Sequence, residues 1–411
     1  MSDPLPHPAT FRWYLSGSSL WMTAISLHGL LIAWIFVGIL ETPAGTYAWI
    51  RFFMELAPLG VLLLGGLWAD RTDARNLILS LTLFAVALPL LLTPFADSIT
   101  LQVAFLFGLS MALLQALSDP ARQSIINRVT RFDIQRTVTV TTVITTLAGL
   151  LGVWIGGKLE TIGIRQILVI QAVVITASAL AFGRLPALPP ALGAEELSAR
   201  SHGVISRLSQ SFAVFWGFPL IRNVIGLNFL SSLFNAGAYT IGVPYIVTQV
   251  YKGGADFFAD TMIWFMAGSI GSTALLLLVM PLLHPGRTFI CLQLTRVAIL
   301  AALWLQPPVW LFFVIIFLWG VNMGITTTLV RTVVQELAPE AHRAKILSIF
   351  LFSFMASAPL SSLMLGTLVE YTNPMTALLP GIPISIAIFV LGLYATGLWA
   401  FRSPSFSNPD Q

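Results

Sequence analysis

Long apolar runs alternate with short polar turns along almost the whole chain. Each run is about twenty residues long, the length that an α-helix needs to cross the hydrocarbon core of a bilayer. Six runs lie in each half of the sequence. Their approximate bounds are 15–40, 46–69, 77–95, 99–118, 136–157, 164–182, 223–248, 257–283, 288–305, 309–330, 346–368 and 377–401. The pattern predicts an all-α membrane protein with 12 transmembrane helices.

The two sets of six runs are separated by a segment rich in Pro, Ser, Ala and charge. We predict an N-terminal six-helix bundle over 1–182, a linker over 183–221 and a C-terminal six-helix bundle over 222–411. Residues 195–210 of the linker can form a short surface helix. The chain is thus expected to fold as two bundles joined by a polar connection.

Composition supports a membrane protein and narrows its chemistry. Of 411 residues, 57% are hydrophobic and 9% are charged, whereas about a quarter of the residues of a soluble domain are charged. The net charge of +4 falls in short loops between apolar runs, which argues against a nucleic-acid partner. Cys291 is the single cysteine, so no internal disulfide can form and no metal site can be built from cysteines. We expect no metal and no cofactor.

The distribution of positive charge predicts the orientation. Sixteen of the 21 Lys and Arg residues lie on alternate loops and at the two ends of the chain, and only three lie on the opposite loops. Loops that carry the excess of Lys and Arg face the cytoplasm. We therefore predict that both termini and the linker are cytoplasmic, which requires an even number of spans.

The two halves of the sequence resemble each other at an offset of about 210 residues. The segment 105–111 aligns with 317–323, and at the same offset Arg131 falls on Arg343. Farther on, the segment from Gly156 to Glu160 falls on the segment from Gly366 to Glu370. Internal repeats of this kind are typical of transporters in which two bundles rock around a central site.

A short charged stretch between the second and third runs carries the most specific motif. Gly66, Asp70, Arg71 and Arg75 match the pattern Gly-x-x-x-Asp-Arg-x-x-x-Arg, and Asp73 stands where the general pattern has a glycine. The stretch resembles the signature loop between the second and third helices of the major facilitator superfamily. The resemblance implies the major facilitator fold, alternating access and secondary active transport.

Two further segments resemble the branch of this superfamily that is similar to the enterobactin exporter. One is Asp119-Pro120-Ala121-Arg122, which closes the fourth run, and the other is the Pro339 to Lys345 loop after the tenth run. This resemblance implies export of small amphipathic compounds that are drug-like or siderophore-like. No convincing copy of the Arg-rich motif of proton-coupled drug antiporters is present, so proton coupling stays an expectation. No phosphate-binding loop for ATP is present.

The charged residues of these loops are predicted to act as a cytoplasmic gate. We expect the charges to tie the two bundles together at the cytoplasmic side and to hold the outward-facing state. The residues assigned to this gate are Gly66, Asp70, Arg71, Arg75, Asp119, Arg122 and Arg343.

Charged side chains inside apolar runs are expensive to bury, so each is a candidate for function. Arg51 and Glu55 are four residues apart and share one face of the second helix, where Glu55 can accept a proton or form a static pair with Arg51. Arg296 lies near the middle of the ninth run. It can serve a substrate or coupling role, or it can be a structural arginine whose head reaches toward water.

Three uncharged polar residues inside runs are further candidates. His28 lies midway along the first run and can bind a substrate, relay a proton or bond a neighbouring helix. Asn228 and Asn235 are two turns apart on one face of the seventh run, a spacing that suits the lining of a cavity or bonds between helices.

These patterns favour a secondary active exporter in the inner membrane of a bacterium, acting as a monomer on a small-molecule substrate, with protons as the candidate coupling ion. An importer of a small metabolite on the same fold is the nearest alternative. A non-transporting sensor or scaffold is another alternative. A membrane enzyme would need histidines and acids gathered at one interface, and the five histidines are scattered along the chain.

Overall fold

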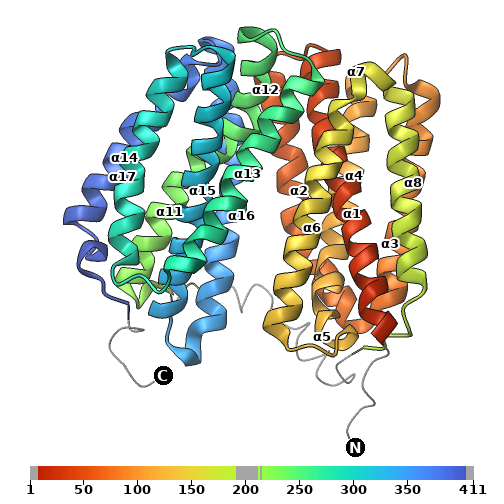
Figure 1. Cartoon of the computed structure of the whole chain (residues 1–411), viewed down its shortest axis with the longest axis horizontal. Coiled ribbons are helices and arrows are strands. Elements are labelled where there is room, and N and C mark those ends of the chain that lie inside the picture. The colour runs from red at the N-terminus through yellow and green to blue at the C-terminus, as the bar shows by residue number, and fades with distance from the viewer. Residues whose placement is uncertain (1–7, 191–211, 213–214, 404–411) are drawn as a thin grey trace, which may run out of the picture. The chain divides into compact units, whose positions relative to one another are not determined.

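We analysed a computed structural model of the chain. It describes residues 8–190, 212 and 215–403, without the side chains of 8, 62–67, 69–70, 134–135, 341 and 344. The regular secondary structure of these residues is helical (Figure 1). Eleven helical segments are long and apolar enough to cross a membrane. The predicted all-α membrane architecture is therefore confirmed at this level.

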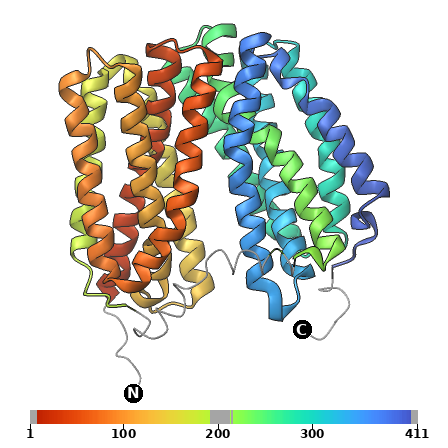
Figure 2. The same cartoon turned by 180° about the vertical axis from the view of Figure 1, so that it is seen from behind.

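In the first half of the chain, six long helices follow one another with short turns between them (Figure 2). A five-residue π-helical turn, Ile35–Ile39, continues the first of them, and two four-residue helices, α5 (Ile126–Val129) and α7 (Leu159–Ile162), lie in the turns. The long helices are α1 (Pro8–Trp34), α2 (Ala44–Arg71), α3 (Ala74–Leu92), α4 (Leu101–Ser124), α6 (Ile134–Gly157) and α8 (Ile164–Gly183).

The second half of the chain repeats this arrangement. Its first span combines α11 (Pro219–Gly237) and the short α12 (Val243–Tyr245), and π-helical turns continue each of the two. The remaining long helices are α13 (Ala255–Val279), α14 (Pro285–Trp304), α15 (Val309–Leu337), α16 (Arg343–Tyr371) and α17 (Gly381–Tyr394).

Helix α2 is the other membrane-length helix of the described chain, with 28 residues. It coincides with the predicted span 46–69, but part of its side chains lies outside the description, so it is not among the eleven spans. The predicted total of twelve spans therefore stays a prediction, as do the cytoplasmic termini. The surface helix predicted over 195–210 lies outside the described residues.

Several helix ends differ from the predicted bounds. The first helix begins at Pro8 rather than at 15, because polar residues such as Arg12 and Ser16 continue the helix before its apolar part. The last long helix ends at Tyr394 rather than at 401, and Gly397 follows it with a φ of 73°. A glycine adopts this left-handed conformation without the steric cost that other residues pay, so the chain turns there.

The chain divides into two compact units. Unit 1 comprises 1–42, 53–202 and 253–260, and unit 2 comprises 43–52, 203–252 and 261–411. The first turns of α2 therefore pack with unit 2, whereas the first turns of α13 pack with unit 1. The predicted boundaries of the bundles and linker stay a prediction.

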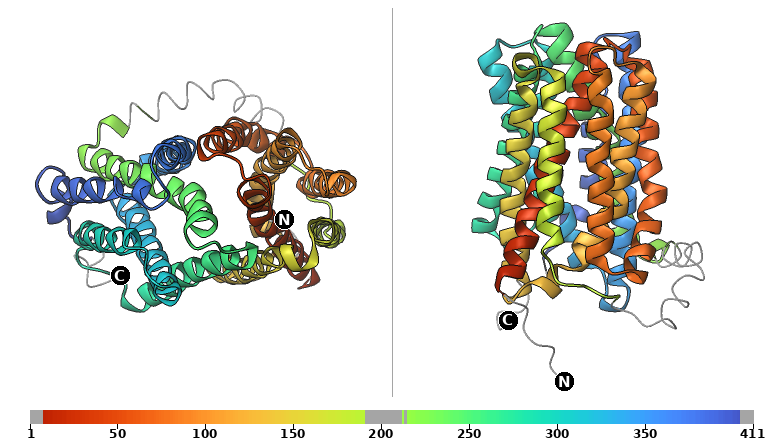
Figure 3. Two further views of the ribbon diagram at one scale, coloured as in Figure 1. Left: turned by 90° about the horizontal axis from the view of Figure 1, so that it is seen from above. Right: turned by 90° about the vertical axis from the view of Figure 1, so that its right-hand side faces the viewer.

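Unit 1 is held together mainly by α1, which packs along α6 and α8 (Figure 3). A Cβ added at Gly152 of α6 would overlap the backbone carbonyl of Thr23 on α1, so only glycine allows this approach. Beside it, the Thr23 hydroxyl donates to the carbonyl of Ala148 at 2.9 Å. Small residues and hydroxyls are the usual means of joining helices where burial from water gives no driving force.

Unit 2 has its own centre, formed where α11 packs against α16 and where α14 packs against α15 and α17. Apolar side chains such as Val330 and Ile346 are almost fully buried in a hydrophobic cluster of this unit. The Ser361 hydroxyl of α16 accepts the backbone N–H of Gly237 at 2.5 Å, where α11 passes into its π-helical turn. The polar groups around Arg296, described below, lie between α11, α14 and α15.

Candidate functional site

The turn between α2 and α3 is fixed by Asp73, the residue that departs from the motif. One carboxylate oxygen of Asp73 accepts the backbone N–H of Asn76 at 3.0 Å, so Asp73 is the N-cap of α3. The other oxygen accepts the N–H of Leu188 at 2.7 Å, and the N–H of Ala74 donates to the Leu188 carbonyl at 2.9 Å. The Asp73 side chain therefore caps α3 and also binds the segment that follows α8.

The arginines around this turn bind the same segment. The Arg75 guanidinium donates to the carbonyl of Gly183 at 2.5 Å, and Arg128 donates to the carbonyl of Pro189 at 2.8 Å. Arg71 is exposed at the end of α2. Gly66 and Asp70 lie in the last two turns of α2, and their side-chain surroundings lie outside the described residues.

Asp119 and Arg122 form an ion pair near the end of α4, with 2.7 Å between Oδ1 and Nη2. The same Nη2 donates to the Ser118 hydroxyl at 2.6 Å. The guanidinium lies 4.2 Å from the centre of the Trp21 ring on α1, and the Tyr14 hydroxyl donates to the Arg122 carbonyl. Arg122 is only 6% exposed, and its contacts with Trp21 and Tyr14 join α4 to α1.

The predicted gate residues thus divide into two groups within unit 1. Arg75 engages the end of α8, whereas Asp119 and Arg122 engage each other and α1. Arg343, the first residue of α16 in unit 2, is exposed. A joint gating action of the seven residues stays a prediction. The capping role of Asp73 was not foreseen, although an Asp placed just before an apolar helix is a recognisable N-cap signal.

Arg51 and Glu55 occur one turn apart on α2, as their spacing predicts, and both are half-buried. Arg51 lies in the segment that packs with unit 2, and Glu55 lies in the part of α2 that packs with unit 1. The helix therefore changes its packing partner between these two charged residues.

His28 is 7% exposed on α1 and lies against α4. The ring centroid of His28 is 4.8 Å from that of Phe107, and the two rings meet edge to face at 75°. This contact gives the imidazole an aromatic neighbour inside unit 1. The geometry suits a packed histidine, and a substrate or proton role stays a prediction.

A buried polar cluster surrounds Arg296 of α14, which is 2% exposed. Its Nη1 donates to the Ser231 hydroxyl at 2.6 Å and to Oε1 of Gln293 at 3.0 Å. Its Nη2 donates to Oδ1 of Asn322 at 3.1 Å. The amide of Asn322 in turn donates to the Leu292 carbonyl and to the Thr295 hydroxyl, each at 2.8 Å. One guanidinium thus joins α11, α14 and α15.

Every acceptor that the described residues offer to Arg296 is neutral. Burying a charge without a counter-charge costs several kcal/mol, and hydrogen bonds to neutral groups offset part of that cost. Because Arg296 is 2% exposed, its side chain is enclosed by protein and does not reach toward water. Ser231 and Asn322 were not foreseen as its partners, because the rotation of one helix against another cannot be read from a single span.

Asn228 and Asn235 of α11 lie on the inner side of unit 2 and are 8% and 5% exposed. The Asn235 amide donates to the carbonyl of Ser231, one turn earlier, at 2.9 Å. Ser231 also accepts from Arg296, so the Asn235 side chain adjoins the arginine cluster. Asn235 thus bonds within its own helix, and a role of Asn228 and Asn235 in lining a cavity stays a prediction.

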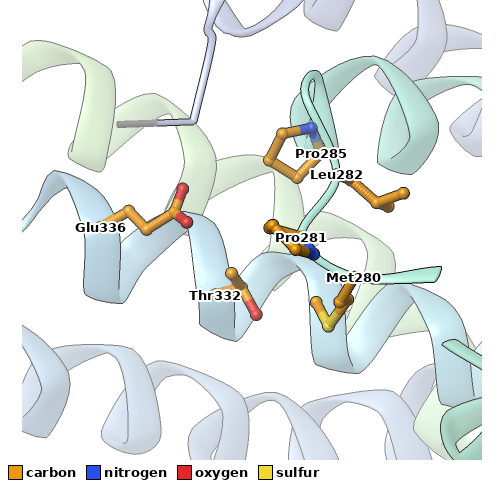
Figure 4. A pocket seen from close by; sticks show the side chains of 6 residues that line it. All are labelled: Met280, Pro281, Leu282, Pro285, Thr332 and Glu336. Carbon is orange, nitrogen blue, oxygen red and sulfur yellow. The ribbon is translucent and has the colours of Figure 1, made fainter. Parts of the chain in front are cut away.

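A pocket of about 320 Å³ lies in unit 2 beside the connection from α13 to α14 (Figure 4). The Glu336 carboxylate, which accepts the Ser403 hydroxyl at 2.8 Å, forms its polar side. None of the predicted site residues lines it. The lining residues are Met280, Pro281, Leu282, Pro285, Thr332 and Glu336.

His284 stands just before α14, outside the membrane-spanning segments. Partial burial and the positive charges of Arg287 and Arg402 lower the pKa of His284. Arg287 is itself held by a hydrogen bond to the Trp399 carbonyl at 2.7 Å and lies over the Trp399 ring. These surroundings disfavour the protonated form of the imidazole.

Comparison with known families gives one match that covers most of the chain. The model of the Major Facilitator Superfamily matches residues 14–362. No curated protein matches the sequence.

Solved structures share the fold at low sequence identity. A POT family transporter in complex with 5-aminolevulinic acid has a TM-score of 0.71 and 15% identity, over 95% of this chain and 98% of the other. The nucleoside transporter NupG has a TM-score of 0.63 and 16% identity, over 95% and 98%. A D-xylose–proton symporter has a TM-score of 0.65 and 14% identity, over 96% and 97%. At such identities the likeness extends to the fold alone.

Proposed function

Because this chain belongs to the Major Facilitator Superfamily, we propose that it is a secondary active exporter of small amphipathic compounds that works by alternating access. The family match over residues 14–362 carries the proposal. The chain is a multi-pass membrane transporter and not an enzyme. The direction of transport, the substrate class and the coupling ion are the proposed parts.

The proposed topology has twelve spans, with α2 as the twelfth, and both termini in the cytoplasm of a bacterium. The excess of arginine on alternate loops supports it. A map of accessible cysteines, introduced one at a time in a Cys291→Ser background, tests the topology. Termini that label from opposite faces of the membrane would contradict it.

The likeness of the 118–123 and 339–345 segments to those of enterobactin-exporter-like proteins supports export of drug-like or siderophore-like compounds. An importer is the second candidate, because one protein of the same fold is a D-xylose–proton symporter. Vesicles of opposite orientation distinguish the two. An exporter accumulates its compound in inside-out vesicles, whereas an importer accumulates it in right-side-out vesicles.

Glu55 is the proposed proton site, because it is a half-buried carboxylate four residues from a half-buried arginine within a membrane-length helix. Uptake into inside-out vesicles is measured with and without a proton gradient, for the parent and for Glu55→Gln. Asp97→Asn is the matched control, because Asp97 is exposed and paired with Arg165 in a loop region. Uptake that survives collapse of the gradient would remove proton coupling.

The cytoplasmic gate is proposed to act through Asp70, in line with the family motif around it. We expect Asp70→Asn to shift the conformational balance toward the state that is open to the cytoplasm. Labelling of cytoplasmic-side cysteines reports the shift. Full transport activity together with an unchanged labelling pattern would remove the gating role.

A further inference from the structure

In α2 and α13 the first turns belong to a different unit from the rest of the helix. A glutamate binds the start of each of these two helices. In unit 2, Oε2 of Glu370 on α16 accepts the backbone N–H of Gly45 at 2.9 Å. In unit 1, Oε1 of Glu160 on α7 accepts the N–H of Ala255 at 3.2 Å. Gly45 is the second residue of α2, and Ala255 is the first residue of α13.

Both contacts satisfy groups that a helix cannot satisfy by itself. The first four N–H groups of a helix have no partner within the helix, and its N-terminus carries a partial positive charge. The first turn of α2 contains no acidic residue, so Glu370 supplies the carboxylate from another helix. A long-range contact of this kind is lost whenever the helix start moves away from the glutamate.

The two glutamates correspond in the internal repeat. The segment 156–160 aligns with 366–370, which places Glu160 on Glu370. Their partners Ala255 and Gly45 are also about 210 residues apart. The same contact therefore occurs twice, once in each unit, from sequence positions that the repeat relates.

Small residues beside each glutamate let the helix start seat closely. A Cβ added at Gly366 would overlap the Cβ of Ala48, and one added at Gly157 would overlap the Cβ of Ala259. At Gly254, an added Cβ would overlap the Glu160 carboxylate. Ala48 and Ala259 are 0% and 3% exposed, so the side chains at these two contacts are shielded from solvent.

We propose that Glu160 and Glu370 are a repeat-related pair of latches that release together when the transporter changes state. The proposal rests on the proposed alternating access, because it is that change which separates the first turns of α2 and α13 from the units on which they are seated. Each latch stabilises the seated state through one carboxylate and one helix start.

Release is measured with one cysteine reporter beside each latch, in a Cys291→Ser background. Ala48→Cys reports the Glu370 latch, and Ala259→Cys reports the Glu160 latch. The rate of labelling by a membrane-impermeant maleimide is compared between the parent and Glu370→Gln or Glu160→Gln. Loss of one charged cap is expected to raise the rate about threefold to tenfold.

The decisive observation is the response of the distant reporter. If the latches release together, Glu370→Gln also accelerates labelling at Ala259→Cys, and Glu160→Gln accelerates labelling at Ala48→Cys. The double variant is expected to show about the product of the two effects. Acceleration confined to the adjacent reporter, or no acceleration, overturns the proposal.

Two controls separate release from misfolding and from loss of charge. Glu41→Gln removes an exposed carboxylate just before α2 and is expected to leave both rates unchanged. Ala104→Cys, at a fully buried position of α4, is expected to stay unlabelled in every variant that retains its fold. A vesicle assay that finds no exported compound would remove the proposed substrate class and leave the labelling result standing.

Discussion

Replacement of Arg296 by methionine tests how unit 2 balances a buried charge against its hydrogen bonds. The change removes three hydrogen bonds from a charged donor, each worth about 1.5–3 kcal/mol. It also removes the cost of burying a guanidinium whose partners among the described residues are all neutral, which is several kcal/mol. The two terms oppose each other at similar size. We therefore expect Arg296→Met to lower the free energy of unfolding by less than about 2 kcal/mol.

Removal of a neutral partner is expected to cost more. Asn322→Leu leaves the guanidinium buried but takes away one of its acceptors, and it also removes two donations from Asn322 to α14. Water cannot replace the lost acceptor, because Arg296 is 2% exposed. We expect a loss of about 2–3 kcal/mol, larger than that of Arg296→Met.

Thermal unfolding of the purified protein in detergent measures both changes. For a unit of about 200 residues, 1 kcal/mol corresponds to roughly 2–4 °C in Tm, so Asn322→Leu is expected to lower Tm by about 5–10 °C. Arg331→Met, at an exposed arginine of α15, is the matched control and is expected to change Tm by about 1 °C or less. A larger loss of Tm for Arg296→Met than for Asn322→Leu would refute the reasoning.

Three further predictions concern the helix ends and loops. Asp73→Ala should lower the free energy of unfolding by about 1–2 kcal/mol, and Asp73→Asn by less, because the amide keeps an acceptor for the cap; denaturation in urea measures both. Arg122→Lys should lower the free energy of unfolding by about 1–2 kcal/mol, because an ammonium cannot both pair with Asp119 and stack on the Trp21 ring. Trp21→Leu should lower Tm as well. The pKa of His284 is lowered in the folded state, so near and below about pH 6.5 the unfolded state binds more protons than the folded state. Stability should therefore fall as the pH drops through that value. His284→Gln should reduce this fall, which is measured as Tm against pH.

The helical class and the family of this chain follow from its sequence. A run of twenty apolar residues has one stable form in a bilayer, because only a helix satisfies its backbone groups within the run. The loop containing Asp70 and Arg75 then carries the family resemblance, which the family match over 14–362 confirms. The internal repeat also predicted the correspondence of Glu160 and Glu370, although not what those carboxylates bind.

The partners of the polar residues were decided only by the tertiary structure. Spacing places Asn228, Ser231 and Asn235 near one another on α11, but only the rotation of that helix in the unit brings Ser231 to Arg296 of α14. Likewise, Glu370 reaches the start of α2 from a helix 325 residues away in sequence. Side-chain spacing along one helix is set by local geometry, whereas contacts between helices depend on how small residues allow them to approach, and that is fixed only when the whole unit packs.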